Sequence, residues 1–169
     1  LQQMILIEAD RQLMRDLHPE QKLKIKLEVD VDPPGDFRTD MVSILQPIPF
    51  AVRVYSLPDL FAGKMHALLC RNWKNRVKGR DWYDFVWYVA NYPRLHLNHL
   101  EQRMRQSGHY DEPAALTAER LRNMLLASLD RISIEQARAE VEPFVADRDA
   151  LSLGSKSFFV DLVDRIEMV

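Results

Sequence analysis

The chain has 169 residues, about the size of one domain and long enough to bury a hydrophobic core. It has 23 Lys and Arg residues against 25 Asp and Glu residues, so the net charge of −2 gives no overall attraction to nucleic acid or anionic membrane. The single cysteine, Cys70, excludes an intramolecular disulfide and a cysteine-rich zinc site. There is no transmembrane-length apolar run and no signal-peptide pattern, so we expect a cytoplasmic protein that does not contact membranes.

The first predicted element is an amphipathic helix over residues 3–17, ended by the sequence HPE. Its apolar positions follow a helical period and are Met4, Ile7, Leu13, Met14 and Leu17. The chain begins inside this pattern and without a methionine. We therefore expect it to be a piece of a longer protein.

The second predicted element is a strand in residues 24–35, with the sequence KIKLEVDVDPPG. Its side chains alternate, so the apolar residues from Leu23 to Val31 share one face and Lys22, Lys24, Lys26, Glu28, Asp30 and Asp32 share the other. The two consecutive prolines should end the strand. The charged face has two interpretations: a solvated surface, or a site where the carboxylates bind Mg²⁺ and the lysines face phosphates.

The remaining pattern predicts a loop or short strand in residues 36–46, a second strand in 49–57, and then helices only. The helices are expected from residue 57 to about 71 and at 80–92, 96–106, 116–129, 133–147 and 156–167. A small mixed sheet followed by a helical bundle indicates an α+β fold. We expect one compact domain, with a sheet region in residues 1–56 and a helical region in 57–169.

A second group of charged residues lies in residues 60–85, where Lys64 interrupts an apolar helix and Asp81 and Asp84 open the next one. Lys64 could simply extend its ammonium group to the surface, and the two aspartates could only stabilise the helix N-terminus. His66 has no partner at a metal-binding spacing, so we expect it to be structural. The aromatic residues of 82–88 are expected in the core or at an interface.

Three stretches, KIKLEVDVDPP, PIPFAVRVYSLPDLFAGKMHALLCR and WKNRVKGRDWYDFVWYV, resemble the later motifs of the AbiEii-type nucleotidyltransferases. These are toxin components of type IV toxin–antitoxin and abortive-infection systems within the polymerase-β nucleotidyltransferase superfamily. The resemblance covers most of the chain. It implies a small sheet that carries metal-binding carboxylates, followed by a helical region.

The resemblance also implies a reaction, in which Mg²⁺ assists transfer of a nucleoside monophosphate from a nucleoside triphosphate to an RNA hydroxyl, tRNA being a candidate acceptor. Glu28 resembles the acidic residue of the family's strand motif, with Asp30 and Asp32 as competitors on the same face. The roles implied are catalysis by Glu28, Asp81 and Asp84, metal binding by Glu28 and Asp30, and nucleotide binding by Lys26, Lys64 and Arg80. We expect Lys26, Glu28 and Asp30 to share a cleft with Lys64.

The first motif of the family is a Gly-Ser or Gly-Gly turn followed by an Asp-x-Asp pair that binds the catalytic metals. This motif is missing here, because none of the five glycines precedes an Asp-x-Asp pair in that order. We therefore expect the chain alone to be inactive even where the whole protein is a Mg²⁺-dependent enzyme. The alternative is a non-catalytic remnant that binds an antitoxin or another protein. In either case, apolar sheet surface left exposed would favour a homodimer.

Overall fold

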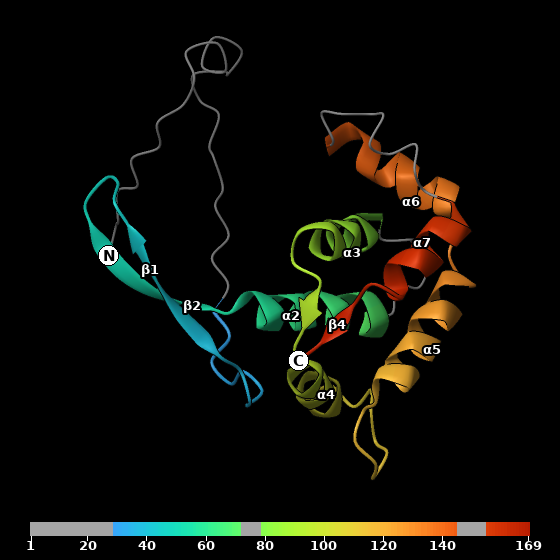
Figure 1. Cartoon of the computed structure of the whole chain (residues 1–169), viewed down its shortest axis with the longest axis horizontal. Helices are drawn as coiled ribbons and strands as arrows, with labels where there is room; N and C mark the ends of the chain where they lie inside the picture. The colour runs from blue at the N-terminus through green and yellow to red at the C-terminus, as the bar shows by residue number, and fades with distance from the viewer. Residues whose placement is uncertain (1–28, 72–78, 145–154) are drawn as a thin grey trace, which may run out of the picture. The chain divides into compact units, whose positions relative to one another are not determined.

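A computed structural model describes residues 29–71, 79–144 and 155–169 (Figure 1). The chain divides into two compact units, Leu1–Pro33 and Pro34–Val169. The described part contains a two-stranded antiparallel sheet, six α-helices and a short pair of parallel strands, all in the second unit. The α+β class is therefore confirmed. The helix predicted for residues 3–17 lies outside the described residues, and the division at residue 56 stays a prediction.

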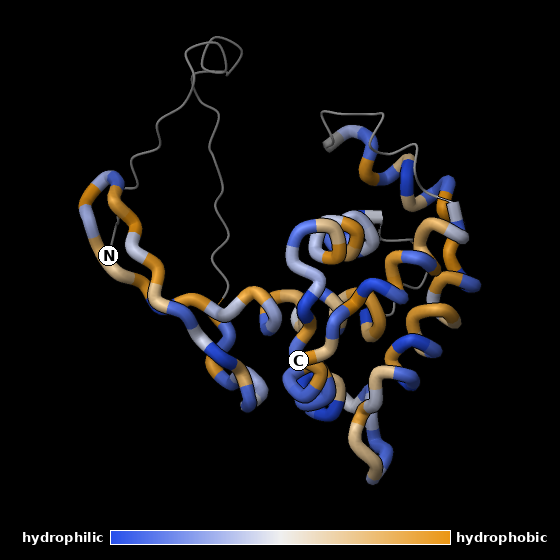
Figure 2. Tube along the Cα trace, viewed as in Figure 1, coloured by the Kyte–Doolittle hydropathy of each residue, from blue (hydrophilic) through white to orange (hydrophobic). Residues whose placement is uncertain are grey.

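The sheet is a hairpin of β1 (Thr39–Ile44) and β2 (Phe50–Tyr55). Its register pairs Thr39 with Tyr55 and Ile44 with Phe50. The strand predicted within 49–57 is confirmed, and residues 36–46 contain a strand of equal length, β1. Apolar residues along this hairpin, drawn orange in Figure 2, include the exposed Met41 and Val42.

The strand predicted for residues 24–32 is wrong where it can be tested, because residues 29–32 form no strand. The carboxylate of Asp30 accepts a hydrogen bond from the backbone N–H of Asp32 at 3.1 Å, which bends the chain locally. Such side-chain bonds compete with strand pairing, and the following prolines have no N–H to donate. Val29 and Val31 are 74% and 90% exposed, so neither is part of a core.

The helices lie where the apolar spacing predicts them, and Pro93 follows the second of them, α3, with Tyr92 between. Their bounds are α2 (Leu57–Cys70), α3 (Gly79–Asn91), α4 (Leu97–Gln106), α5 (Ala118–Leu129), α6 (Ile134–Val141) with a 3-10 turn at Glu142–Phe144, and α7 (Lys156–Val163). The last helix is shorter than the predicted 156–167 because it ends at the cap residue Asp164. Large side chains from α2, α3, α4 and α5 form the core, among them Phe61, Phe85, Leu100 and Leu121.

Helices α2 and α3 pack through aromatic rings. Phe61 of α2 stacks on Tyr88 of α3 with ring centroids 4.8 Å apart and planes 1° from parallel. Trp82 of α3 meets Phe159 of α7 edge to face at 5.4 Å. Trp82, Phe85 and Tyr88 are buried, as expected from the sequence. These contacts fix the rotation of α3 about its axis relative to α2.

A buried carboxylate, Asp59, joins three parts of the second unit. It lies in the first turn of α2 and accepts hydrogen bonds from the Ser56 hydroxyl, from the Arg38 backbone N–H at 3.1 Å and from Nδ1 of His96 at 2.7 Å. Ser56 is the N-cap residue of α2, but its hydroxyl donates to Asp59 rather than accepting from the helix. The chain before β1, the start of α2 and the start of α4 are thereby held together.

A second constraint is the contact between α3 and α6 at Gly79. A Cβ atom at Gly79 would lie 1.9 Å from the backbone oxygen of Ala137, much closer than atoms can approach. The Gly79 N–H also donates to Oε2 of Glu140 at 2.6 Å, so α6 supplies an acceptor for the N-terminus of α3. Only glycine allows this approach of the two backbones.

The pair β3 (Arg94–Leu95) and β4 (Glu167–Met168) is parallel. The N–H of Glu167 donates to the carbonyl of Pro93, and the N–H of Val169 to the carbonyl of Leu95, both at 2.9 Å. The link between α3 and α4 is therefore held by residues that follow α7 (Figure 1).

The first prediction concerns Gly79. Gly79→Ala should lower the free energy of unfolding by roughly 1–3 kcal/mol, because the backbones of α3 and α6 must separate to admit the methyl group. The matched control is Gly35→Ala, since a Cβ there meets no atom within 4 Å. That variant should stay within about 1 kcal/mol of wild type in urea unfolding. Equal effects of the two substitutions would contradict the proposed role of the close approach.

The second prediction concerns Asp59. Asp59→Asn should cost roughly 2–4 kcal/mol in urea unfolding, because the amide leaves buried donors of Ser56, Arg38 or His96 unpaired. Asp30→Asn, at an exposed bend, should change stability by less than about 0.5 kcal/mol.

The same variant tests the pH dependence. Burial of Asp59 disfavours its ionisation, but the bonds from Ser56, His96 and Arg38 together outweigh this, so its pKa lies below the usual 3.8. A lowered folded-state pKa means that the charged carboxylate stabilises the fold above pH 3.8, and that this contribution disappears as the pH falls through the folded-state value. Wild type should therefore lose more stability on acidification than Asp59→Asn does. If the free energy of unfolding of the two proteins fell in parallel with pH, Asp59 would not be the cause of the loss of stability on acidification.

Candidate functional site

The candidate site is formed by Lys64 of α2 and Asp84 of α3. The Lys64 ammonium group donates to Oδ2 of Asp84 at 2.6 Å. The side chains are 44% and 23% exposed, so the pair lies at the rim of the interface between the two helices. This is one of the two pairings expected for Asp84 from the sequence. It brings together two motifs that lie 20 residues apart.

The local sequence explains why these side chains meet. Lys64 lies beside Met65, which is 1% exposed, and Asp84 beside Phe85, which is also 1% exposed. Those two residues fix the buried faces of α2 and α3, so their neighbours come to the rim of the same interface. Asp84 also raises the pKa of the nearby Tyr88, although burial of that phenol is the larger cause. Tyr88 therefore stays neutral next to the ion pair.

The two other charged residues of the second motif lie on the first turn of α3. Arg80 is exposed, and Asp81 is half-buried in the turn where the helix dipole favours a carboxylate. Arg80 and Asp84 are four residues apart, but Asp84 pairs with Lys64. Asp81 lies in the first turn of α3 and Asp84 one turn later. Their roles in catalysis stay predictions.

The structure also places Arg103 of α4 beside α2, a residue that the sequence pattern did not single out. A methyl group at Gly63, the residue before Lys64, would lie 3.8 Å from Cζ of Arg103. Nε of Arg103 and Nε2 of the buried His99 have no hydrogen-bond partner among the described residues. Arg103 is thus a second cation beside the Lys64 segment. No spacing rule connects it with Lys64, because it comes from another helix.

The structure describes only some of the strand residues assigned to metal and nucleotide binding. Lys26 and Glu28 lie outside the described residues, so the expected cleft of Lys26, Glu28, Asp30 and Lys64 stays untested. Asp30 and Asp32 are exposed on the bend that replaces the strand. The described ranges contain one group of three residues that could hold a metal ion, and it includes no carboxylate. No three carboxylates come together in the described ranges.

That group consists of His66, Cys70 and His109, so the expectation that His66 has no potential partner ligand is wrong. The sequence shows only that His66 and Cys70 lie one helical turn apart. His109 follows α4 and reaches them through the packing of α4 on α2.

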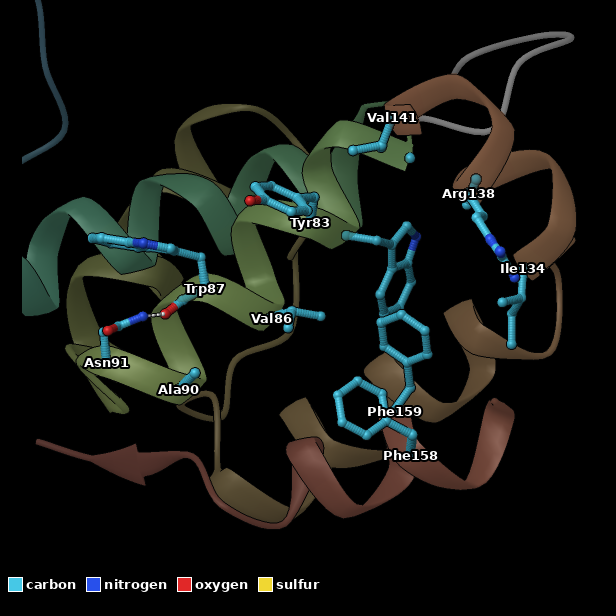
Figure 3. Close-up of a pocket in the computed structure, with 13 residues that line it drawn as sticks. Tyr83, Val86, Trp87, Ala90, Asn91, Ile134, Arg138, Val141, Phe158 and Phe159 are labelled. Atoms are coloured by element: carbon cyan, nitrogen blue, oxygen red, sulfur yellow. Dashed lines mark hydrogen bonds between the residues drawn. The ribbon is translucent and has the colours of Figure 1, made fainter. Parts of the chain in front are cut away.

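A separate apolar pocket of about 250 Å³ lies among α3, α6 and α7 (Figure 3). Its wall includes Trp82, Val86, Ile134 and Phe159, and Arg138 is the one charged residue among those that line it. Lys64, Arg80, Asp81 and Asp84 are not part of this wall. An apolar pocket with a single charge does not suit a triphosphate, so we do not assign the nucleotide to it.

In the part of the chain that the structure describes, none of the helices is long and apolar enough to cross a membrane.

Comparisons with known proteins give one match. No curated protein and no solved structure matches the chain. A family model described as nucleotidyl transferase AbiEii toxin, type IV toxin–antitoxin system, matches residues 5–160. This range includes the hairpin, the Lys64–Asp84 pair and most of the helical region. The chain therefore belongs to the AbiEii nucleotidyltransferase toxin family of type IV toxin–antitoxin systems.

Proposed function

We propose that the protein transfers a nucleoside monophosphate from a nucleoside triphosphate to an RNA hydroxyl, with tRNA as the candidate acceptor. The observation that supports this best is the contact of 2.6 Å between Lys64 and Asp84, because the family resemblance implies nucleotide binding by the first and catalysis by the second. Phosphoryl transfer depends mainly on positioning and on stabilising negative charge. A lysine held in place at a helix interface supplies both.

Lys64 is proposed to bind the phosphates. Its side chain is 44% exposed, so the ammonium group can contact Asp84 on one side and a phosphate oxygen on the solvent side. Negative charge develops on the departing pyrophosphate, and a fixed cation next to it lowers the barrier. Arg80 and Lys26 are proposed as further phosphate contacts.

Asp84 is proposed to position Lys64. A lysine side chain has four rotatable bonds, and a carboxylate at 2.6 Å restricts where the ammonium group can lie. Asp81 and Glu28 are proposed to assist catalysis, by orienting the attacking hydroxyl or removing its proton.

Mg²⁺ is the proposed cofactor on the basis of family membership, and Glu28 and Asp30 are its proposed ligands. Mg²⁺ in such sites uses one or two carboxylates and completes its shell with substrate phosphates and water. When bound, it would neutralise phosphate charge. The roles given above to Lys64 and Asp84 are argued from their own contact and do not depend on the ion.

The family implies an antitoxin as protein partner, and we propose that the protein acts in the cytoplasm. The exposed apolar residues of the hairpin, including Met41 and Val42, are a candidate surface for a homodimer. A non-catalytic antitoxin-binding role is the alternative.

The third prediction tests the ion pair in the product of the whole gene. Lys64→Met should lower label transfer from nucleoside triphosphates to bulk tRNA by about 10²-fold, because one charge-stabilising donor is removed. Asp84→Asn should raise the KM for the nucleotide and lower kcat less, since Lys64 remains but is less well placed. Asp84→Glu should restore part of the activity.

The control is the exposed ion pair Lys156–Asp130, which has the same chemistry. Lys156→Met and Asp130→Asn should change transfer by less than about twofold, since exposed pairs contribute little. Urea unfolding of each variant separates loss of folding from loss of activity. If Asp81→Ala abolishes toxicity and Asp84→Ala leaves it intact, the assignment of the two aspartates is reversed. If folded Lys64→Met retains full activity, the alternative of a binding module is favoured.

The fourth prediction is that the 169-residue chain alone transfers no label. Two-metal transfer needs ligands on both sides of the ions, and the sequence has no glycine turn leading into an Asp-x-Asp pair. The test compares this chain with the product of the whole gene in the presence of Mg²⁺, each labelled nucleoside triphosphate and bulk tRNA. Similar rates would mean that these residues contain a complete metal site.

A further inference from the structure

Three potential metal ligands converge at the C-terminal end of α2. His66 and Cys70 lie one turn apart on that helix, and His109 comes from the segment after α4. The ligand atoms of the three residues all lie within 4.8 Å of one another. Cys70 is buried, His66 is half-buried and His109 is exposed. The group is therefore open to solvent at His109 and shielded from solvent at Cys70.

Nε2 of His66 and Nδ1 of His109 both face the Ser107 hydroxyl, at 2.8 Å and 2.9 Å. A bound ion would replace this hydroxyl at the nitrogens that it uses. The rings are nearly perpendicular, at 87°, with centroids 6.3 Å apart. Ser107 thus holds both histidines near the thiol.

We propose that His66, Cys70 and His109 form a binding site for Zn²⁺, with water in the fourth position. Thiolate and imidazole are the ligands that Zn²⁺ prefers, and tetrahedral coordination needs ligand atoms roughly 3.3–3.6 Å apart at the usual Zn–N and Zn–S lengths. The observed spread of up to 4.8 Å must therefore shrink by about 1 Å, which rotation of the exposed His109 side chain can provide. Mg²⁺ prefers oxygen ligands and does not fit this set.

Charged side chains lie near the cluster. Burial first, and then the positive charges of Arg103, His109 and Arg71, lower the pKa of His66 to about 4. Burial raises the pKa of Cys70 to about 11. The nearby arginines repel a cation, so a site here needs the negative charge of a metal-bound thiolate.

This inference is independent of the proposed nucleotidyl transfer. A bound ion would connect α2 to the segment after α4 and would stabilise the folded state in proportion to its occupancy. It would also fix the end of α2 at Arg71, the residue that precedes the basic segment 72–78.

The experiment titrates the purified chain with Zn²⁺ against a chromophoric chelator, and with Co²⁺ as a spectroscopic probe. We expect one ion per chain and a thiolate-to-cobalt charge-transfer band. Cys70→Ser should abolish the band and weaken binding at least about tenfold, and His109→Ala should weaken binding by a similar factor. His18→Ala, which removes a histidine not assigned to the site, should change neither the cobalt band nor the Zn²⁺ affinity. Mg²⁺ should not compete with Zn²⁺ for the site.

Folding and thiol access are controlled separately. His109 is exposed, so His109→Ala should unfold in urea like wild type without metal, and its lower affinity then reports a lost ligand. Zn²⁺ should also slow alkylation of Cys70 in wild type and much less in His109→Ala. Equal Zn²⁺ affinity in wild type, Cys70→Ser and His109→Ala, or absence of the cobalt band, would overturn the proposal.

Discussion

The second unit depends on one buried carboxylate. Asp59 is 1% exposed and accepts bonds from a loop, from the cap of α2 and from the first residues of α4. A carboxylate this deeply buried is tolerated only when donors surround it, so these three segments must arrive together for the fold to form. Lys64 lies just over one turn further along the same helix. The position of the candidate site therefore follows from how the start of α2 is anchored.

The ion pair at the candidate site is weaker than this anchor, and that difference suits its proposed task. Lys64 and Asp84 are both partly exposed, and pairs of this kind typically contribute no more than about 1 kcal/mol. The ammonium group can therefore share its contacts with a phosphate without loosening the helices. The rigidity needed for positioning comes instead from the stacked rings of Phe61 and Tyr88 and from the contact at Gly79. Stability and binding thus rest on different residues of α2 and α3.

Helix positions could be predicted because they follow from local spacing of apolar residues and from prolines that stop a helix, as Pro93 does after α3. Alternation wrongly predicts a strand at residues 29–32, where the carboxylate of Asp30 bonds to the backbone two residues on and replaces strand pairing. Helical spacing and the family resemblance leave Arg80 and Lys64 as partners of Asp84, and the packing of α2 on α3 selects Lys64. His109 was not, because its approach to His66 is set by the packing of α4, and Ser107, which contacts both rings, lies 41 residues from His66.

The pairing of β3 with β4 has a consequence for synthesis on the ribosome. Residues 94–95 can pair only after residues 167–169 have been made, so a contact between distant parts of the chain must wait for α5, α6 and α7. Local helices such as α2 and α3 can form earlier, as nearby contacts do in general. The link between α3 and α4, which carries His96 to Asp59, would then be the last part of the core to become ordered. During translation, the residues of the candidate site would therefore be made before the link between α3 and α4 has taken its final position.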